Sequence, residues 1–542
     1  MSHANLDLSQ ISKAMQRLAA AGFGSVDELL SRLESANISF MNPLLATDVY
    51  KMGHMEQYKP GTTEVYSYLI ARTDRQYKHT VFFALQYWLR TYLTRKLTPE
   101  MAEEFLENRK AILGANSEEV ERKVRALCKL GYFPIEVRAV KEGTVMPMRN
   151  VLMILKNTLP EFEWVPGFLE SLILKVWDAI TTASCSFTYR QIVNAMYKRT
   201  VDEGLMFLQE FAVHDFGYRG SKSEEEAAIT GGAHLACFTG SDTVPAREWL
   251  IRNYGADRKS PFILSVPASE HSVMCSFGRG DEIDAFRNML RLYPEGIVSI
   301  VSDTYDVYEV CSNFALAMRD EILSRPGDMS KVVFRPDSGD PEKIICGDPN
   351  AHVGSREWKG VLRLLEEVFG STTNSKGFKQ LNPKVGLIYG DGMYLNRYVR
   401  TLARLEEMGY AASNLVIGVG GILRNHSRDA MGFALKATHV VNGGKSVDIE
   451  KDPITDQNKK SHKGLMYLTR DEYGAYQTVD KCTAKEEKGG LLEVVFRDGQ
   501  MVGEQSFAEI RARVQAAIEE YPIDMDALIA EARAELAGGN LR

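Results

Sequence analysis

Three cationic side chains of this sequence lie in loops that glycine or proline marks: Arg219, His271 and Arg335. Each loop follows an apolar run. The guanidinium group is a rigid, planar donor that fits phosphate oxygens, and a neighbouring glycine lets backbone N–H groups approach the same anion. A single arginine of this kind is more often a surface or ion-pair residue. Three cations in this setting predict a substrate with several phosphate groups.

Carboxylates alternate with these cations along the chain: Asp242, Asp303, Asp337 and Asp391. A carboxylate repels a bare phosphate, but it accepts hydrogen bonds from ribose hydroxyls and holds magnesium through water. Cations and carboxylates together therefore predict a sugar phosphate as the substrate. The alternative is that some of these residues are helix N-caps, and it stays open for Asp303 and for Asp340.

Gly420 and Gly421 follow an apolar run and form a candidate phosphate cradle, which is a weak signal alone. The sequence has no G-x-x-x-x-G-K-[ST] loop, no G-x-G-x-x-G fingerprint, no G-x-S-x-G and no H-E-x-x-H. These absences argue against P-loop kinases, dinucleotide-binding folds, typical hydrolases and zinc proteases.

Apolar, strand-like runs end just before most of these polar residues. The runs cover residues 298–302, 332–334, 385–389 and 415–417. Helix-like stretches, such as 357–369 and 394–408, follow several of them. Repeated strand-then-helix units predict a parallel sheet or barrel, in which ligands bind at the carboxyl ends of the strands. We therefore expect one site on one rim, the alternative being that these are plain turn residues.

The composition narrows the class of protein. The chain has 542 residues, of which 44% are hydrophobic and 25% charged, as in globular proteins. A net charge of −7 disfavours binding to nucleic acid or to an anionic membrane. The seven cysteines form no C-x-x-C pair, and we find no signal peptide and no membrane span. We expect a cytoplasmic enzyme or scaffold.

Ten segments make the sequence recognisable. They are LLATDVYKMGH (44–54), VYSYLIAR (65–72), HDFGYRG (214–220), GSDTV (240–244), SVPASEHS (265–272), VSDTYDVY (301–308), FRPDSGDP (334–341), GDGMYLN (390–396), SRDAMGFALK (427–436) and EKDP (450–453). In type and order they resemble the nicotinamide phosphoribosyltransferases, a branch of the type II phosphoribosyltransferases. The resemblance spans residues 42 to about 510, although the glycine run at 418–421 is one glycine shorter than the family pattern.

The resemblance implies an α/β fold: the type II phosphoribosyltransferase fold, with an irregular β/α barrel and a mixed α+β domain built from the N- and C-terminal parts. We expect a helical extension over residues 1–40 and an N-terminal α+β part over 41–180. The barrel-like catalytic domain would cover 181–440, and a C-terminal part, 441–542, would pack with the N-terminal part.

The same resemblance implies a reaction: 5-phosphoribosyl 1-pyrophosphate and nicotinamide give nicotinamide mononucleotide and pyrophosphate, with Mg²⁺ as cofactor, in NAD salvage. It also implies a homodimer whose two active sites lie at the subunit interface. The resemblance further implies ATP as a coupled activator, whose phosphoryl group His271 would accept as a neutral nucleophile. The alternative, which stays open, is that His271 is only a cation for the pyrophosphate.

The resemblance assigns roles to individual residues. Phe216 and Tyr50 of the partner subunit would stack on the pyridine ring, Asp242 would accept the carboxamide N–H, and Asp48 would lie near the ring. The pyrophosphate group would be surrounded by Arg219, His271, Arg335, Arg72 and Lys451. Ribose hydroxyls would lie near Asp303, Asp337 and Asp391, and the 5′-phosphate near Gly390, Gly420, Gly421, Arg428 and Lys436. Arg428 and Lys436 would reach across the interface, and Arg72 and Lys451 would come from the partner chain. We expect His271, Arg335 and Asp337 to be catalytic, and we assign no direct metal ligand.

Three other functions remain open at this point. Nicotinate phosphoribosyltransferase is the nearest, and Asp242 argues against it because an ionised carboxylate repels the acid. Quinolinate phosphoribosyltransferase would require more cations around Asp242. A non-catalytic signalling or binding protein on the same scaffold would not need the full set of charged loop residues.

Overall fold

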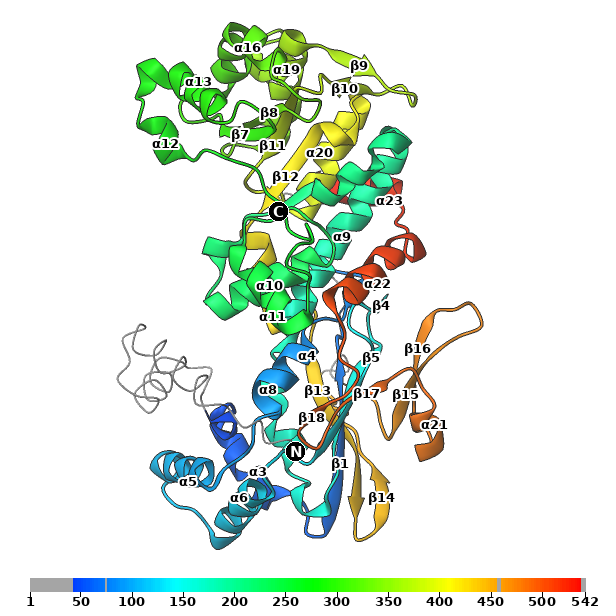
Figure 1. The fold of residues 1–542 in the computed structure, drawn as a ribbon. Helices are drawn as coiled ribbons and strands as arrows, with labels where there is room; N and C mark the ends of the chain where they lie inside the picture. The colour runs from blue at the N-terminus through cyan, green and yellow to red at the C-terminus, as the bar shows by residue number, and fades with distance from the viewer. Residues whose placement is uncertain (1–41, 74–75, 456–459, 538–542) are drawn as a thin grey trace, which may run out of the picture.

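The computed structural model describes residues 42–73, 76–455 and 460–537. The predicted extension at 1–40 lies outside this part of the chain. Two sheets organise the fold, an antiparallel one and a parallel one, and they lie toward opposite ends of the molecule in Figure 1. Each sheet positions a different group of the predicted site residues.

The antiparallel sheet has seven strands in the order β14-β13-β1-β5-β3-β17-β18. Their bounds are β1 Thr62–Ile70, β3 Ile135–Ala139, β5 Val151–Asn157, β13 Ala434–Asn442, β14 Lys445–Asp448, β17 Glu493–Arg497 and β18 Gln500–Met501. Three strands come from the first third of the chain and four from beyond residue 430. The sheet is therefore the expected α+β part built from both ends of the chain, and β13 crosses the predicted boundary at 440.

The central strand β1 explains why this sheet forms. Its sequence, TTEVYSYLI, is rich in aromatic and β-branched residues, which suit a pleated and buried surface. Its last six residues are buried, and it pairs along its length with β13 and β5. The pairing with β13 joins segments more than 360 residues apart, since Lys436 lies opposite Tyr68.

The parallel sheet has five strands in the order β6-β12-β11-β8-β7. Their bounds are β6 Val213–Asp215, β7 Ile297–Val301, β8 Lys331–Arg335, β11 Val385–Tyr389 and β12 Leu415–Val419. Four of these strands match the four apolar runs of the sequence. Helix α20, Leu395–Glu407, confirms the helix expected over 394–408, whereas the stretch 357–369 breaks at Gly360, whose φ is +74°.

Two short extended segments close this sheet into a barrel. Isolated parallel bridges join Asp215 to Ser241, Gly240 to Leu264, and Ala268 to Ser299. Starting from β6, the ring therefore passes through residues 239–241 and 264–268 and reaches β7 on the far edge of the sheet. An irregular β/α barrel, as expected, is the result.

Helix α9, Val176–Thr200, connects the two parts of the fold. It is buried on almost every face, as expected for a helix enclosed by other elements. It packs against β2 (His79–Val81) on one side and against helices α10 (Glu224–Leu235) and α20 of the barrel on the other. The predicted boundary at residue 180 falls within this helix.

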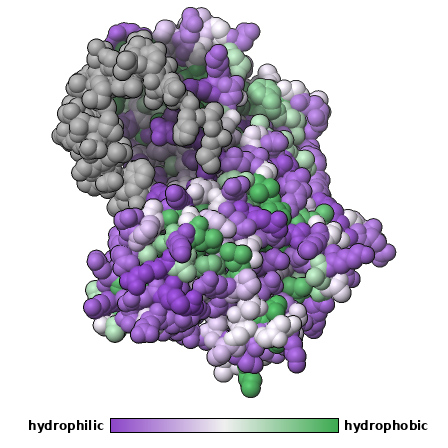
Figure 2. Space-filling view, turned by 60° about the horizontal axis from the view of Figure 1, so that its bottom comes forward, coloured by the Kyte–Doolittle hydropathy of each residue, from purple (hydrophilic) through white to green (hydrophobic). Residues whose placement is uncertain are grey.

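Three further observations concern membrane-spanning helices, the cysteines and the surface. No helix of the described residues combines the length and the apolar character that a membrane crossing needs. All seven cysteines are free thiols. The face in Figure 2 is mostly hydrophilic, with apolar side chains in small groups among the polar ones.

Candidate active site

The first group of predicted residues lies at the carboxyl ends of the barrel segments. We call it the rim cluster; its members are Phe216, Arg219, Asp242, His271, Asp303, Arg335, Asp337, Gly390, Asp391, Gly420 and Gly421. β6 ends just before Phe216, and Asp242 follows the closing segment 239–241. Arg219 lies in the same loop as Phe216, and His271 follows the closing segment 264–268. β7, β8, β11 and β12 end at or just before the other members. The expectation of one rim is confirmed for these residues.

The ring of Phe216 lies against the backbone of the neighbouring strands. A Cβ atom added at Gly418 would overlap this ring, and one added at Gly390 would overlap the Asp337 carboxylate and touch the ring. The Phe216 N–H also donates to the carbonyl of Val419 at 2.9 Å. Glycines are therefore needed at 390 and 418 because an aromatic ring and a carboxylate occupy the space of a side chain.

Asp242 is held in an ionised state. Its N–H donates to the Asp215 carbonyl at 3.0 Å. His214 Nε2 lies 3.0 Å from Asp242 Oδ1, and the Ser265 hydroxyl donates to the same oxygen. Burial raises the pKa of Asp242, but the hydrogen bonds from His214 and Ser265 and the charge of His214 outweigh it, so the pKa lies below the usual range. An ionised carboxylate only accepts hydrogen bonds, so His214 must donate through Nε2.

A second part of the rim cluster combines cations with carboxylates. His271 Nε2 lies 3.2 Å from Asp303 Oδ1; the side chain of Asp303 is 5% exposed and that of His271 47% exposed. Arg335 Nη2 donates to the Ser269 carbonyl at 3.0 Å. Burial raises the pKa of Asp337, and the charges of Asp303 and Asp391 raise it further, against the opposing charges of Arg335 and His271. These five groups are therefore close enough to share one highly charged ligand.

The second group lies beside the antiparallel sheet. We call it the sheet cluster; its members are Asp48, Tyr50, Arg72, Arg428, Lys436 and Lys451. Burial lowers the pKa of Lys436, Glu170 opposes this shift, and the charges of Arg72, Lys451 and Lys51 lower it further. Several cations thus converge at β13, where an anion would relieve their repulsion.

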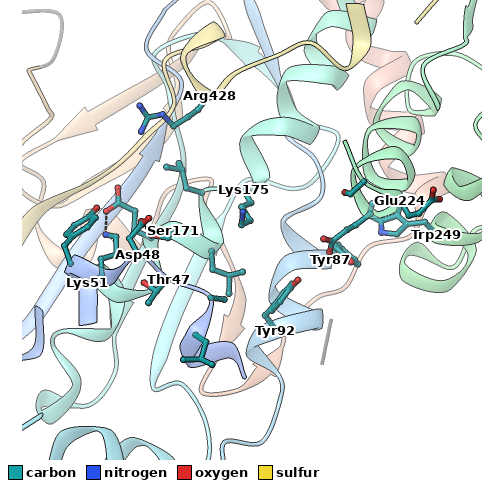
Figure 3. Close-up of a pocket in the computed structure, with 18 residues that line it drawn as sticks. Thr47, Asp48, Lys51, Tyr87, Tyr92, Ser171, Lys175, Glu224, Trp249 and Arg428 are labelled. Carbon is teal, nitrogen blue, oxygen red and sulfur yellow. Dashed lines mark hydrogen bonds and ion pairs between the residues drawn. The ribbon is translucent and has the colours of Figure 1, made fainter. Parts of the chain in front are cut away.

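An open cavity of about 910 Å³ borders the sheet cluster, and Asp48, Tyr50 and Arg428 line it (Figure 3). The ring of Tyr50 is 63% exposed, and the Lys51 ammonium group lies 5.2 Å from its centre. Lys51 itself is buried, and its Nζ donates to the Gly167 carbonyl and to Glu170 at 2.9 and 2.7 Å. The exposed Tyr50 ring is thus positioned by Lys51, the next residue in the chain, whose side chain is buried and held by hydrogen bonds.

The structure of one chain does not bring the rim and sheet clusters together. The strands of the rim cluster lie toward one end of the molecule, and β1 and β13 lie toward the other (Figure 1). Tyr50 precedes β1, whereas Phe216 follows β6 of the parallel sheet. Lys436 lies on β13, whereas Gly420 and Gly421 follow β12. Tyr50 and Lys436, both expected from the partner subunit, therefore belong to a different part of the chain from the groups that they were expected to face.

Comparison with known proteins decides the family. The model of the nicotinate phosphoribosyltransferase (NAPRTase) family matches residues 211–500, and that of the nicotinamide phosphoribosyltransferase N-terminal domain matches residues 42–118. The chain is 37% identical over 509 residues to a nicotinamide phosphoribosyltransferase of Acinetobacter baylyi, covering 89% of this chain and 98% of that protein. A protein of the same name from Xanthomonas campestris is 38% identical over 489 residues, covering 88% and 98%.

The chain belongs to the nicotinamide phosphoribosyltransferase family. Solved structures confirm the fold. A nicotinate-nucleotide pyrophosphorylase from Pyrococcus furiosus superposes with a TM-score of 0.55 at 15% identity, covering 90% of this chain and 98% of that one. Human nicotinic acid phosphoribosyltransferase gives 0.50 at 17% identity, covering 89% and 95%. The type II phosphoribosyltransferase fold expected from the sequence is therefore correct.

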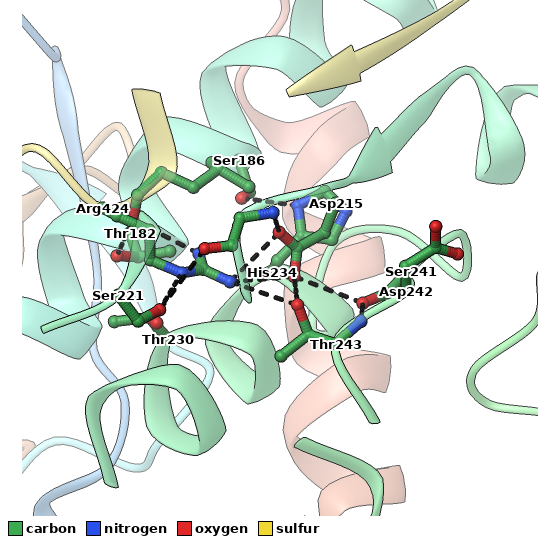
Figure 4. Close-up of polar contacts among 12 residues, drawn as sticks. Thr182, Ser186, Asp215, Ser221, Thr230, His234, Ser241, Asp242, Thr243 and Arg424 are labelled. Carbon is green, nitrogen blue, oxygen red and sulfur yellow. Dashed lines mark hydrogen bonds and ion pairs between the residues drawn. The ribbon is translucent and has the colours of Figure 1, made fainter. Parts of the chain in front are cut away.

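Sequence reasoning missed one part of this family member's site. Asp215 and Arg424 form a fully buried ion pair directly beneath the loops of the rim cluster (Figure 4). Asp215 lies within the matching segment 214–220, but only Phe216 and Arg219 were singled out there. The available signal was a carboxylate at the end of an apolar run, two residues before Gly217, since such a residue is seldom buried without a partner.

Proposed function

We propose that this protein transfers the phosphoribosyl group of 5-phosphoribosyl 1-pyrophosphate to nicotinamide, giving nicotinamide mononucleotide and pyrophosphate. The observation that carries this proposal is the arrangement of the rim cluster. An aromatic ring and an ionised carboxylate, Phe216 and Asp242, lie on the same rim as the charged groups around Asp337. Membership in the nicotinamide phosphoribosyltransferase family supports the same activity.

The base would be held by a ring contact and a hydrogen bond. An aromatic face such as that of Phe216 binds a flat pyridine without blocking its ring nitrogen. Asp242, ionised and fixed by His214 and Ser265, accepts an N–H of the carboxamide. The pyridine nitrogen already carries a lone pair, so no general base is needed, and positioning supplies the rate enhancement.

Bond cleavage separates charge across the rim. When the C1–O bond breaks, positive charge develops on the ribose and negative charge on the pyrophosphate. Arg335 and His271, with Arg219, would stabilise the leaving group, and the carboxylates of Asp303 and Asp337 would lie near the ribose. Preplaced charges contribute most in the transition state because they need no reorganisation.

The residues of the rim fit magnesium that is bound together with the substrate. Among the described residues, no group of three or more His, Cys, Asp or Glu side chains is arranged to hold a metal ion. Magnesium in proteins usually keeps several waters and binds one or two carboxylates plus substrate phosphates. Asp303 and Asp337 suit that mode, since Asp337 already lies among like charges. When bound, magnesium would offset negative charge on the pyrophosphate.

The active unit is proposed to be a homodimer. The sheet cluster combines an exposed aromatic ring, Tyr50, with the cations that converge on Lys436, while the rim cluster contains the complementary base and ribose groups. A two-fold symmetric pair of chains brings two different patches together twice. Each site would then take its rim cluster from one chain and its sheet cluster from the other, and the cavity beside Tyr50 would receive the partner's rim.

Coupling to ATP and a cytoplasmic location complete the proposal. His271 is half-exposed and hydrogen-bonded to a buried carboxylate, Asp303, and this geometry suits an imidazole that accepts a phosphoryl group. The seven free thiols agree with a reducing compartment.

A pyrophosphate-release assay with four reactions tests the proposed function. The purified chain is supplied with 5-phosphoribosyl 1-pyrophosphate, Mg²⁺ and either nicotinamide, nicotinate, quinolinate or no base. We expect release that depends on nicotinamide, with stoichiometric nicotinamide mononucleotide. Preferential release with nicotinate or quinolinate would overturn the substrate assignment, and no release with any base would favour a non-catalytic protein.

A further inference from the structure

The ion pair between Asp215 and Arg424 is fully buried. Arg424 Nη2 lies 3.0 Å from Asp215 Oδ1 and 2.9 Å from Oδ2, and both side chains are 0% exposed. Transfer of two charges from water into a protein interior costs several kcal/mol per ion, and the attraction between them often only offsets that cost. A contribution to stability alone is therefore a weak explanation of this ion pair. The contacts around the pair suggest a second role.

Three chain segments meet at the Asp215 carboxylate (Figure 4). The N–H of Gly217 donates to Oδ1 at 2.8 Å. The hydroxyls of Thr243 and Ser241 donate to Oδ2 at 2.7 and 3.2 Å. Burial raises the pKa of this carboxyl, but the charge of Arg424 and the hydrogen bonds outweigh it, so the group is ionised in the folded protein.

Arg424 links the loop after β12 to the loop after β6. Its Nε donates to the Ser221 hydroxyl at 3.0 Å. A Cβ atom at Gly217 would lie 2.7 Å from the guanidinium carbon, so glycine is needed there for the arginine to approach. The carbonyl of the preceding residue, Leu423, accepts a hydrogen bond from Thr182 of α9 at 3.1 Å. The loop after β12 is thus tied both to Asp215 and to the central helix.

Each of these segments carries part of the proposed substrate site. Phe216 and Arg219 lie between Asp215 and Ser221, and Asp242 lies between Ser241 and Thr243. Gly420 and Gly421 come just before Arg424. We infer that Asp215 and Arg424 are positioning residues, which hold the base-binding groups and the glycine loop of the phosphoribosyl site at one fixed spacing. The inference rests on the proposed function, and neither residue is assigned a contact with substrate.

A second buried ion pair offers a matched control. Arg138 Nη1 lies 2.8 Å from Glu487 Oε1, and the side chains are 9% and 4% exposed. This pair joins β3 of the antiparallel sheet to α21, Ala484–Lys488, which belongs to neither cluster. Loss of either pair leaves a buried carboxylate without its cation, so both losses destabilise the fold, but only the first disturbs the rim.

The experiment compares Arg424→Gln, Arg424→Lys and Arg138→Gln in the full chain. We measure the thermal midpoint, and kcat and KM for nicotinamide and for 5-phosphoribosyl 1-pyrophosphate, per folded enzyme. A misplacement of about 1 Å costs on the order of 100-fold in rate, so we expect kcat/KM of Arg424→Gln to fall by about that factor. Lysine keeps the charge but not the forked geometry, so Arg424→Lys should recover only part of the activity. Arg138→Gln should lower the midpoint and leave both KM values unchanged.

Thr243→Val keeps the experiment informative even where Arg424→Gln fails to fold. This change removes one hydrogen bond to Asp215 and keeps the side-chain shape, and it should raise KM for nicotinamide in a folded enzyme. If Arg424→Gln folds and has wild-type kinetics, the inference is wrong. If Arg424→Gln does not fold, wild-type kinetics in Thr243→Val would overturn the inference. A wild-type protein without transferase activity would overturn the proposed function as well, whereas an active wild type with unaffected variants overturns this inference alone.

Discussion

Asp242 should determine the choice between nicotinamide and nicotinate, and replacing it by asparagine tests this. Within the described residues, both side-chain hydrogen bonds of Asp242 end on Oδ1, from His214 and Ser265. Oδ2 is therefore the acceptor for an incoming carboxamide N–H. The carboxylate of nicotinate offers no such donor and brings a second negative charge to the same place.

The size of the effect follows from charge and exposure. Two unit charges about 4 Å apart repel by about 4 kcal/mol at an effective dielectric constant of about 20, and by about 1 kcal/mol in bulk water. The side chain of Asp242 is 46% exposed in the chain alone, so water screens it until a base fills the site. We expect a value near the upper limit in the bound state. At about 1.4 kcal/mol per factor of ten, this is a preference of about 10³ for nicotinamide.

The assay is kcat/KM for each base in wild type, Asp242→Asn and Asp242→Ser. The asparagine keeps the shape of the side chain, and the serine keeps an oxygen that can accept a hydrogen bond. The N-cap of the following helix, α11 (Val244–Tyr254), is Thr243, so neither change removes a side-chain cap. Both variants remove the negative charge and with it the charge repulsion. The preference for nicotinamide over nicotinate should therefore shrink from about 10³ toward about ten, which corresponds to about 1.4 kcal/mol. If the thermal midpoint falls while the preference ratio stays at its wild-type value, Asp242 only holds His214 and Ser265 in place, and the reasoning is wrong.

Three further predictions concern the rim and the buried core. Incubation with γ-labelled ATP should leave an acid-labile label on the wild type; label that persists in His271→Ala would contradict that assignment. Gly418→Ala should displace the Phe216 ring and raise KM for nicotinamide; an unchanged KM would show that the ring does not bind the base. Burial lowers the pKa of His234 and of His426 to about 4, so the unfolded chain takes up protons below pH ~6.5 that the folded protein excludes. The free energy of unfolding in urea should therefore be fully retained above that pH and fall toward pH 4 by up to about 1.4 kcal/mol per pH unit for each histidine, and glutamine at both positions should flatten this slope.

The sequence was informative where periodicity and strand ends coincide. The apolar run at 385–389 and the helix at 394–408 correspond closely to β11 and α20, and the polar residues after the strands do share one rim. The closure of the barrel was not predictable. Segments 239–241 and 264–268 contribute only single bridges, and segments this short carry no repeating pattern that distinguishes a strand from a loop.

Contacts between segments far apart in the chain were the second feature that the sequence could not predict. Asp215 and Arg424 are 209 positions apart, and no spacing rule connects them. The sheet cluster came from family resemblance alone, because Arg72 and Lys436 lie in or beside antiparallel strands whose pairing depends on the whole fold. Propensity describes each strand separately, whereas the position of a cation depends on which strands become neighbours.

The most direct test of the central claim, a transferase site shared by two chains, mixes two inactive variants. Phe216→Ala damages the rim cluster and Arg428→Ala the sheet cluster. A mixed dimer would have one site with both defects and one intact site. Random exchange of subunits should therefore restore nicotinamide mononucleotide formation to about a quarter of the wild-type rate. No recovery, with mixed dimers demonstrated by native mass spectrometry, would contradict the shared site.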